Sequence, residues 1–316
     1  MSAGAPLFLS SGDAAVDRRL DWARALLEEG NAADAAALLA EATERAPGFL
    51  PGWLLLGEAR LAGGEEEAAA EAFRRALALD PQDRLGAGAR LARLAGGREA
   101  DTPAASGLSA AYVRTLFDQY AGRFDAALAK LDYSGPERIE AALAQACAAL
   151  ARPFAFARAL DLGCGTGLVG ARLGQRIGWL AGVDLSPNMV ERARARGGYD
   201  ELAAADMTSW LAARPAGEVD LVFAGDAFCY LADLGPVLVE SARVLEPAGL
   251  LAFTVETHDG EGVLLRETLR YAHAEPYMRA ALEAAGLSLL SCTHASTRTE
   301  KGEPVPGLVL VAQRAG

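Results

Sequence analysis

The chain has 316 residues and a net charge of −12 at pH 7, and 52% of its residues are hydrophobic. A large apolar core is therefore available over a length of about two domains. The acidic balance disfavours tight binding to a phosphate backbone, which needs a basic face, and we expect no nucleic-acid partner.

The cysteines are widely spaced and form no C-x-x-C pair; they are Cys147, Cys164, Cys229 and Cys292. This spacing argues against a zinc site or a disulfide framework and favours a reducing compartment. No uncharged run approaches the roughly 18 residues that span a bilayer, and the first residues lack the pattern of a signal peptide. We therefore expect a cytoplasmic protein without membrane contact.

The first elements in chain order are the helices of a repeat. Residues 16–83 carry the tetratricopeptide signature twice, with a period of 34 residues. The second copy fills its positions with Trp53, Leu56, Gly57, Gly64, Ala69, Phe73, Ala76 and Pro81. The first copy keeps Gly30, Ala35, Ala42 and Pro47 but has Arg19 in place of the tryptophan. A further helix, Arg84 to Ala95, is predicted to cap the repeats.

Two repeats and a cap fall short of the three or more repeats that an array normally needs for stability. We therefore expect this segment to dock on the other domain, on a second copy of the chain, or on a protein partner. The Gly-, Pro- and Ser-containing stretch that follows is typical of a linker. The predicted organisation is an extension at 1–15, a repeat domain at 16–95, a linker at 96–108 and a second domain at 109–316.

The second domain begins with helical patterns and continues as an α/β alternation. A helix rich in aromatic residues is expected from Ser109, and another from about Gly135 to Leu150. Short apolar runs then alternate with helical ones, which predicts an open, mostly parallel sheet covered on both faces. The expected strands are Ala157–Leu162, Trp179–Asp184, Glu201–Ala205, Val219–Ala224, Leu250–Glu256, Ser288–His294 and Gly307–Gln313. Only a loop separates the last two, which favours an antiparallel final strand.

A glycine loop follows the first strand, in the stretch ALDLGCGTGLVGARLG at residues 159–174. The loop brings backbone N–H groups close to a ligand. Its glycines are Gly163, Gly165 and Gly167, and Leu168 stands where a dinucleotide fingerprint requires glycine. No Gly-Lys-Ser/Thr follows, so P-loop chemistry is absent as well. A pyrophosphate ligand is therefore disfavoured, and with it a dehydrogenase.

Acidic residues follow successive strands at spacings that suit an adenosine. Asp161 precedes the loop, and Asp184 ends the next strand, where a carboxylate can accept from both ribose hydroxyls. Asp206 is placed to accept from the adenine amine, with Met207 beside it to cover the ring. S-adenosylmethionine joins adenosine to an amino acid without a phosphate and fits this set. Asp184 and Asp206 also fit helix N-caps, and Asp161 with the glycines fits an ordinary tight turn.

The stretches ALDLGCGTG, GVDLS, ADM and VDLVFAGDAFCYL resemble the motifs of class I S-adenosylmethionine-dependent methyltransferases. With the repeats in front, the chain resembles bacterial methyltransferases that carry tetratricopeptide repeats. The resemblance implies a Rossmann-like fold, S-adenosyl-L-methionine as cofactor, and aromatic residues folded over that cofactor from the preceding helix. The implied cofactor set is Tyr120, Phe124, Asp161, Gly163, Gly165, Gly167, Asp184, Leu185, Asp206 and Met207.

Methyl transfer needs a general base only when the acceptor keeps its proton at neutral pH. The candidates are Asp226, just past a strand of the sheet, and His273, which tyrosines flank. Either side chain is equally compatible with a structural or solvated role. Candidate substrate-binding residues are Tyr230, His258, Tyr271 and Tyr277. No cluster of residue types suggests a metal.

The leading hypothesis is an enzyme that methylates a small molecule, or a peptide or carrier-bound acceptor. The repeat domain would then bind a partner or mediate self-association. Methylation of a nucleic-acid base is disfavoured because AGDAFCYL lacks the Asn/Asp-Pro-Pro-aromatic loop of such enzymes. The alternative is an interaction protein whose α/β domain binds the cofactor without catalysis.

Overall fold

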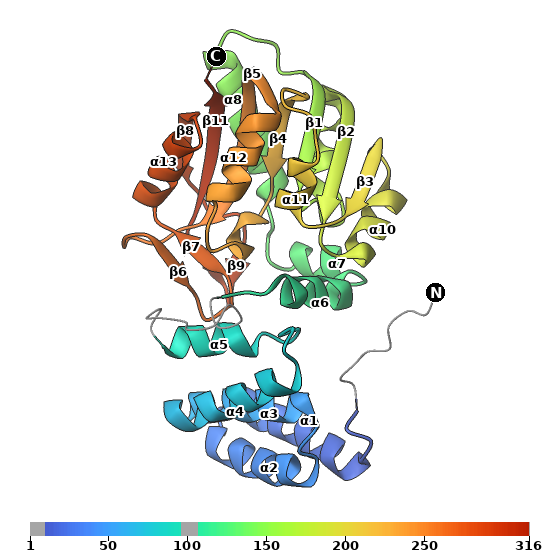
Figure 1. Cartoon of the computed structure of the whole chain (residues 1–316), viewed down its shortest axis with the longest axis vertical. Coiled ribbons are helices and arrows are strands. Elements are labelled where there is room, and N and C mark those ends of the chain that lie inside the picture. The colour runs from blue at the N-terminus through green and yellow to red at the C-terminus, as the bar shows by residue number, and fades with distance from the viewer. Residues whose placement is uncertain (1–9, 96–106, 316) are drawn as a thin grey trace. The chain divides into compact units, whose positions relative to one another are not determined.

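The computed structural model describes residues 10–95 and 107–315. The chain divides into two compact units, residues 1–112 and 113–316, each with its own core (Figure 1). The predicted extension at 1–15 and linker at 96–108 lie largely outside the described residues.

The first unit consists of two successive helix pairs and one further helix. The helices are α1 (Ala14–Glu28), α2 (Ala32–Arg45), α3 (Leu50–Ala62), α4 (Glu66–Leu79) and α5 (Ala87–Leu94). Both repeats fold in the same way although the first has lost its tryptophan. Arg19, at that position, pairs with Glu41 at 3.5 Å.

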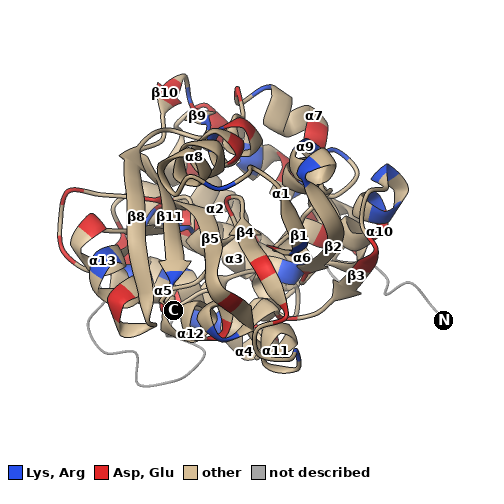
Figure 2. Cartoon of the chain, turned by 90° about the horizontal axis from the view of Figure 1, so that it is seen from above, with Lys and Arg blue, Asp and Glu red and all other residues tan. Residues whose placement is uncertain are grey.

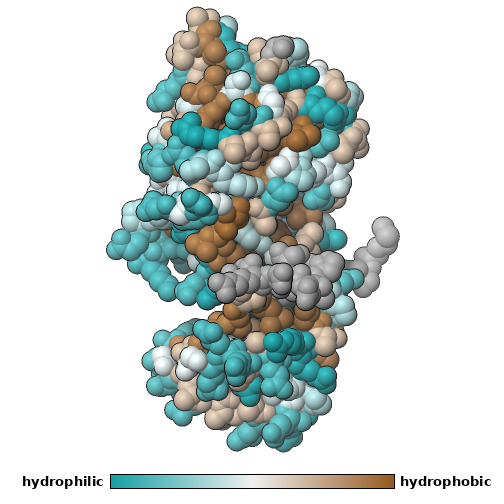
Figure 3. Space-filling model, turned by 60° about the vertical axis from the view of Figure 1, so that its left-hand side comes forward, coloured by the Kyte–Doolittle hydropathy of each residue, from teal (hydrophilic) through white to brown (hydrophobic). Residues whose placement is uncertain are grey.

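Small signature residues allow these helices to pack closely. A Cβ atom at Gly57 would lie 2.4 Å from the ring of Phe73, which is itself completely buried. The equivalent alanines of both repeats are no more than 1% exposed; they are Ala35, Ala42, Ala69 and Ala76. Hydrophilic residues cover most of the visible lower part of this unit in Figure 3. The repeat signature is thus explained by the contacts between its helices.

The second unit is built on a mostly parallel sheet with the strand order β3-β2-β1-β4-β5-β11-β8 (Figure 2). Its strands are β1 (Phe156–Leu162), β2 (Ile177–Asp184), β3 (Glu201–Ala204), β4 (Val219–Ala224), β5 (Leu245–Glu256), β8 (Leu287–His294) and β11 (Gly307–Arg314). The last strand, β11, runs antiparallel to both β5 and β8, as the short connection predicts. The expected α/β class is confirmed.

Helices cover both faces of this sheet and enclose two apolar cores. On one face lie α8 (Gly135–Ala149) and α9 (Leu168–Leu173). The other face is covered by α11 (Met207–Ala212), α12 (Gly235–Val244) and α13 (Glu275–Ala284), while α10 (Pro187–Arg196) packs beside β2 and β3. Every residue of β4 is buried, because a central parallel strand is covered on both sides.

The structure differs from the prediction in one helix and in several short strands. The single helix expected from Ser109 is two helices, α6 (Ala110–Tyr120) and α7 (Phe124–Ala129). Gly122, a poor helix former, lies in the turn between them. Short strands were missed because their length shows no periodicity: these are β6 (Val263–Leu265), β7 (Tyr271–His273), β9 (Thr299–Glu300) and β10 (Glu303–Pro304). Within the described ranges no helix is long and apolar enough to cross a bilayer.

Candidate active site

The glycine loop joins β1 to α9 at the carboxyl edge of the sheet, where ligands of open α/β sheets bind. Gly163, Gly165 and Gly167 have φ angles of +67°, +55° and +86°, a region that side chains disfavour. A Cβ at Gly163 would also lie 2.4 Å from the Cβ of Ala227. The loop therefore requires glycine for both its backbone and its packing.

Asp184 ends β2 and supports this loop directly. Its Oδ2 accepts from the backbone N–H of Gly165 at 2.9 Å, and its Oδ1 accepts from that of Ser186 at 2.8 Å. The N-cap of α10 is Ser186, whose Oγ accepts from the N–H of Met189. The helix-cap alternative for Asp184 is therefore wrong. Each carboxylate oxygen keeps a lone pair for a ligand hydroxyl. Leu185 follows it and is half-buried.

Asp206 caps α11, as the alternative interpretation of this residue predicted. Its Oδ1 accepts from the N–H of Ser209 at 2.8 Å, and its Oδ2 makes no hydrogen bond to a described residue. A cap and a contact with adenine use different oxygens, so the two roles are compatible. The methyl group of Met207 would lie 3.7 Å from a Cβ at Gly163, beside the loop.

Asp161 lies beneath the loop and is 1% exposed. Its Oδ2 accepts from the hydroxyl of Tyr199 at 2.6 Å. Burial, together with the nearby Asp184 carboxylate, raises the pKa of Asp161 to about 7. Burial likewise raises the pKa of Asp184 to about 6. Sequence reasoning missed Tyr199, which shares no motif with Asp161.

The carboxylates around the loop lack cationic partners. Within the described ranges, Asp161, Asp184 and Asp206 form no ion pair with lysine or arginine, and their hydrogen bonds come from backbone N–H groups and a tyrosine. The site therefore favours a ligand that carries positive charge and disfavours one that carries phosphates.

Aromatic residues of α6 and α7 lie beside the loop. The rings of Tyr120 and Phe124 are 6.1 Å apart, edge to face. Atom Cε1 of Phe124 would be 3.8 Å from a Cβ at Gly165. Both predicted aromatic residues are half-buried. Phe124 is thus placed to cover a ligand on the loop.

Polar contacts hold these two helices against the loop and α10. The hydroxyl of Thr166 donates to Asp125 at 2.6 Å, and Arg196 contacts both Asp125 and the carbonyl of Thr166. On α6, Asp118 accepts from the hydroxyl of Ser186 at 2.5 Å. We call the segment Ala110–Ala129 the lid. Sequence reasoning did not identify these contacts, which join residues far apart in the chain.

Asp226 follows β4 with a φ of +52°, a strained conformation for aspartate. The hydroxyls of Thr254 and Thr297 donate to its two oxygens at 2.7 and 2.8 Å. Ala227, the next residue, is the one that approaches Gly163. Asp226 is therefore held next to the loop in a fixed orientation.

His273 lies in β7 and is completely buried. Its Nε2 is 3.0 Å from the carbonyl oxygen of Leu231, and its ring stacks on Tyr277 with centroids 5.6 Å apart. Burial lowers the pKa of His273 to about 4. None of these contacts involves the predicted cofactor set, and Nδ1 of the ring is buried without a hydrogen bond to a described residue.

The remaining predicted substrate residues are spread over several environments. The hydroxyl of Tyr230 accepts from Nε of Arg270 at 2.9 Å, and its ring is 5.1 Å from that of Phe117 in the lid. His258 accepts from the N–H of Gly260, and Tyr271 is buried in β7. Through this ring Tyr230 contacts the lid.

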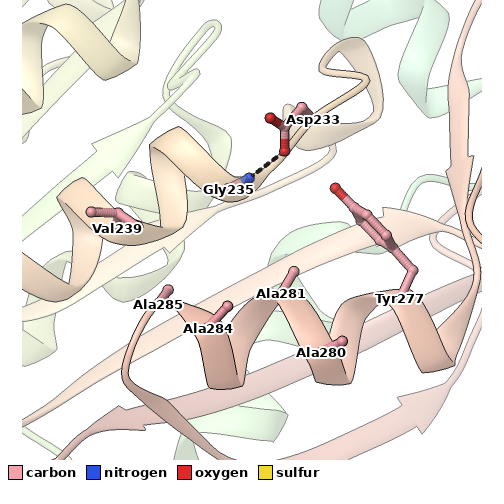
Figure 4. A pocket seen from close by; sticks show the side chains of 8 residues that line it. All are labelled: Asp233, Gly235, Val239, Tyr277, Ala280, Ala281, Ala284 and Ala285. Carbon is pink, nitrogen blue, oxygen red and sulfur yellow. Dashed lines mark hydrogen bonds between the residues drawn. The ribbon is translucent and has the colours of Figure 1, made fainter.

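Tyr277 lines a separate cavity of about 270 Å³ between α12 and α13. Figure 4 shows its ring on α13, opposite Asp233 and Gly235 at the start of α12. The other lining residues are Val239, Ala280, Ala281, Ala284 and Ala285. No residue of the glycine loop takes part, so this cavity is distinct from the site at the sheet edge. Together, the loop, the carboxylates without cationic partners and the lid form one candidate ligand site at the carboxyl edge of an α/β domain.

Comparison with known protein families agrees with this class. Residues 160–253 match the methyltransferase domain family, and residues 20–84 match the tetratricopeptide repeat. The first match contains the glycine loop and the carboxyl ends of β1, β2, β3 and β4. The chain carries a methyltransferase domain preceded by tetratricopeptide repeats.

Several curated proteins with similar sequences are named as methyltransferases or methyltransferase-like. Methyltransferase-like protein 27 of Homo sapiens is 34% identical over 177 residues, which cover 54% of this chain and 66% of that protein. Trans-aconitate 2-methyltransferase of Azoarcus sp. (strain BH72) is 37% identical over 118 residues, which cover 35% of this chain and 45% of that protein. The chain thus spans between 45% and 66% of the length of these two relatives.

Solved structures share the fold at lower identity. The [4+2]-cyclase SpnF has a TM-score of 0.52 and 18% identity, covering 66% of this chain and 98% of that one. The methyltransferase bound to the Haloferax volcanii Trm112 activator has a TM-score of 0.50 and 21% identity, covering 63% and 98%. This likeness concerns the fold alone, and it confirms the Rossmann-like architecture.

Proposed function

We propose that this chain is an S-adenosylmethionine-dependent methyltransferase that acts on a small molecule or on a peptide or carrier-bound acceptor. The observation that carries the proposal is the glycine loop surrounded by carboxylates without cationic partners. S-adenosylmethionine brings a sulfonium and an ammonium to these carboxylates, whereas a dinucleotide brings two negative phosphates. A small-molecule acceptor is supported by the relatives named trans-aconitate 2-methyltransferase.

When bound, this cofactor supplies a methyl group that is already activated for displacement. The chain's own residues then hold the cofactor and align it with the acceptor. Asp184 accepts from the ribose hydroxyls, Oδ2 of Asp206 accepts from the adenine amine, and Asp161 lies below the methionine part. The lid excludes water through Tyr120 and Phe124, whose faces also attract a sulfonium. Catalysis then comes mainly from proximity and alignment.

The proposed mechanism assigns no proton transfer to His273, because its imidazole is enclosed and its Nε2 faces a backbone carbonyl. Asp226 remains the candidate base for an acceptor that must lose a proton, since it lies next to the loop. The hydroxyls of Thr254 and Thr297 hold its carboxylate in place.

The alternative is a repeat-containing interaction protein whose α/β domain binds the cofactor without catalysis. The shared fold of the [4+2]-cyclase SpnF favours keeping this alternative, because one fold hosts different reactions. In both cases we propose that the repeats bind a protein partner or a second copy of the chain, in a reducing compartment that suits the chain's free cysteines.

Calorimetry with S-adenosylhomocysteine, and with NAD as control, tests the cofactor. We expect binding of the first compound only; the reverse preference contradicts the proposal. Transfer of a labelled methyl group to metabolite and protein fractions of the native cell then separates the hypotheses. Label in any fraction supports an enzyme, and binding without transfer supports the interaction protein.

A further inference from the structure

Three arginines converge on the carboxyl end of β5. Glu256 closes this strand and is 4% exposed. Atom Nε of Arg266 is 3.5 Å and Nη1 of Arg270 is 3.9 Å from its carboxylate oxygens, and Nη2 of Arg298 contacts it directly. We call Arg266, Arg270 and Arg298 the arginine cluster. Among them, Arg298 is buried like Glu256, while the other two are about one quarter exposed.

Two independent lines of contact join the arginine cluster to the glycine loop. In the first, Nη1 of Arg298 is 3.9 Å from Oδ2 of Asp226. Ala227, which follows Asp226 in the chain, lies directly against Gly163. Through the lid, Arg270 donates to Tyr230, and the ring of Tyr230 packs against Phe117. Phe117 in turn packs on Phe124, with ring centroids 6.0 Å apart. The cluster therefore borders the place where an acceptor must meet the cofactor.

The guanidinium groups retain unused hydrogen-bond donors. Glu300 accepts from Arg270 and from Arg298, and these contacts together with Glu256 occupy one side of each guanidinium. Neither Nη2 of Arg270 nor Nη1 of Arg298 makes a hydrogen bond within the described part of the chain, and neither atom is sealed from solvent. Nη2 of Arg270, on a side chain that is about one quarter exposed, is thus a donor that a ligand can reach.

Charge at this place contrasts with the chain as a whole, whose net charge is −12. Three arginines face the carboxylates of Glu256, Glu300 and Asp226, so the formal charges balance at this place. Hydroxyls also bond both oxygens of Asp226. An anion of low charge therefore meets no net negative charge here and can bind without displacing the existing pairs.

We propose that the arginine cluster binds a carboxylate of the methyl acceptor, which makes the acceptor an organic acid. This inference rests on the proposed methyltransferase function. Planar guanidinium groups match the geometry of a carboxylate, and Glu256 and Glu300 already use that match. A phosphate would bring its whole charge on one group to three nearby carboxylates, whereas each carboxylate of an organic acid brings a single charge. The aromatic rings of Phe117 and Tyr230 contact the apolar part of the acid.

The test uses the full chain with S-adenosylhomocysteine at saturation and follows binding of simple probes by calorimetry. The probes are succinate, inorganic phosphate and, as the uncharged control, dimethyl succinate, each at millimolar concentration. We expect succinate to bind and its diester not to bind. Arg270→Gln and Arg266→Gln should each weaken succinate binding by about tenfold or more, because each removes a charge-assisted donor.

Arg279→Gln is the matched control, since Arg279 also pairs with a glutamate but lies on α13 and is 56% exposed. It should bind succinate as the original chain does. Two variants are used because either could fold poorly, and melting temperatures are measured for both. A lower melting temperature with unchanged succinate affinity assigns the cluster a purely structural role and overturns the inference.

The remaining outcomes separate this inference from the proposed function. Failure of S-adenosylhomocysteine to bind contradicts the proposed function. Normal binding of that compound without any succinate binding overturns the acid acceptor alone. Tighter binding of phosphate than of succinate overturns the choice of a carboxylate. Labelled-methyl transfer confined to the acidic metabolite fraction, and reduced about tenfold or more in Arg270→Gln, supports the inference.

Discussion

Asp184 carries two tasks at once. Its carboxylate orders the glycine loop through the N–H of Gly165, and in our proposal it also accepts from ribose hydroxyls. A loss of this side chain therefore affects both the shape of the loop and the direct contact with the ligand.

We expect Asp184→Ala to weaken S-adenosylhomocysteine binding by about a hundredfold, the equivalent of one to two charged hydrogen bonds. The far-ultraviolet circular dichroism should stay unchanged. Asp233→Ala is the control, because Asp233 likewise accepts from a backbone N–H, that of Gly235, outside the loop. Equal affinity of the Asp184 variant and the original chain in calorimetry would refute the ribose contact.

The raised pKa of Asp161 predicts a pH dependence of stability. Its folded value of about 7 lies above the ordinary 3.8, so the folded state holds a proton that the unfolded chain releases between these values. The free energy of unfolding from this group therefore falls as pH rises through that interval. Asp161→Asn keeps an acceptor for Tyr199 and removes the titration.

Urea denaturation at about pH 5 and about pH 8 measures this effect. The variant should gain stability relative to the original chain at the higher pH, and Asp233→Asn, an exposed position, should show no such gain. An equal response of all three proteins to pH would show that Asp161 does not titrate in this range.

For single residues, the sequence predicted the acids of the site but not the residues that they contact. Asp161, Asp184 and Asp206 lie at or just past the ends of strands, and strand ends can be read from apolar runs. Tyr199 and Thr297 lie far along the chain from the aspartates that they contact. Such pairs depend on how the elements pack, which local spacing does not encode. His273 was singled out by neighbouring tyrosines, and one of them, Tyr277, stacks on its ring.

Polar contacts contribute to the position of the lid. Its helix α7 has no buried residue, so Asp125 and its bonds to Thr166 and Arg196 hold it in place. A lid fixed in this way can release when the contacts break, which suits entry of a cofactor.

We expect Asp125→Ala to loosen the lid and weaken S-adenosylhomocysteine binding several-fold, since partly exposed pairs contribute about 0.2–1 kcal/mol each. Glu191→Ala is the control, because Glu191 forms an exposed pair with Arg194 on α10. Faster cofactor dissociation in stopped-flow measurements should accompany the loss. Unchanged dissociation in Asp125→Ala would mean that the lid is held by its aromatic contacts instead.

The strands that form the parallel part of the sheet were predicted well because burial on both faces gives long apolar runs. Elements of two or three residues, such as β9 and β7, carry no such signal. The break between α6 and α7 was missed because aromatic spacing continues across it. The repeats were found through Gly57 and Phe73, whose close contact explains the signature.

For the whole molecule, the division into two compact units predicts that their stabilities can be changed separately. Phe73→Ala removes a fully buried ring from the helical unit and should cost about 3–5 kcal/mol. Thermal unfolding followed by circular dichroism should show the loss, while S-adenosylhomocysteine affinity stays unchanged below that transition. Loss of S-adenosylhomocysteine affinity when the helical unit unfolds would show that the two units fold as one.

The position of β11 has a consequence for biosynthesis. Residues 307–314 form an interior strand between β5 and β8, so a nascent chain displays two unpaired strand edges until the ribosome has released them. The helical unit, encoded first and rich in local contacts, is complete long before. During that interval the half-made sheet is open to aggregation, and its rescue by chaperones should matter more than for a protein whose last strand lies at an edge.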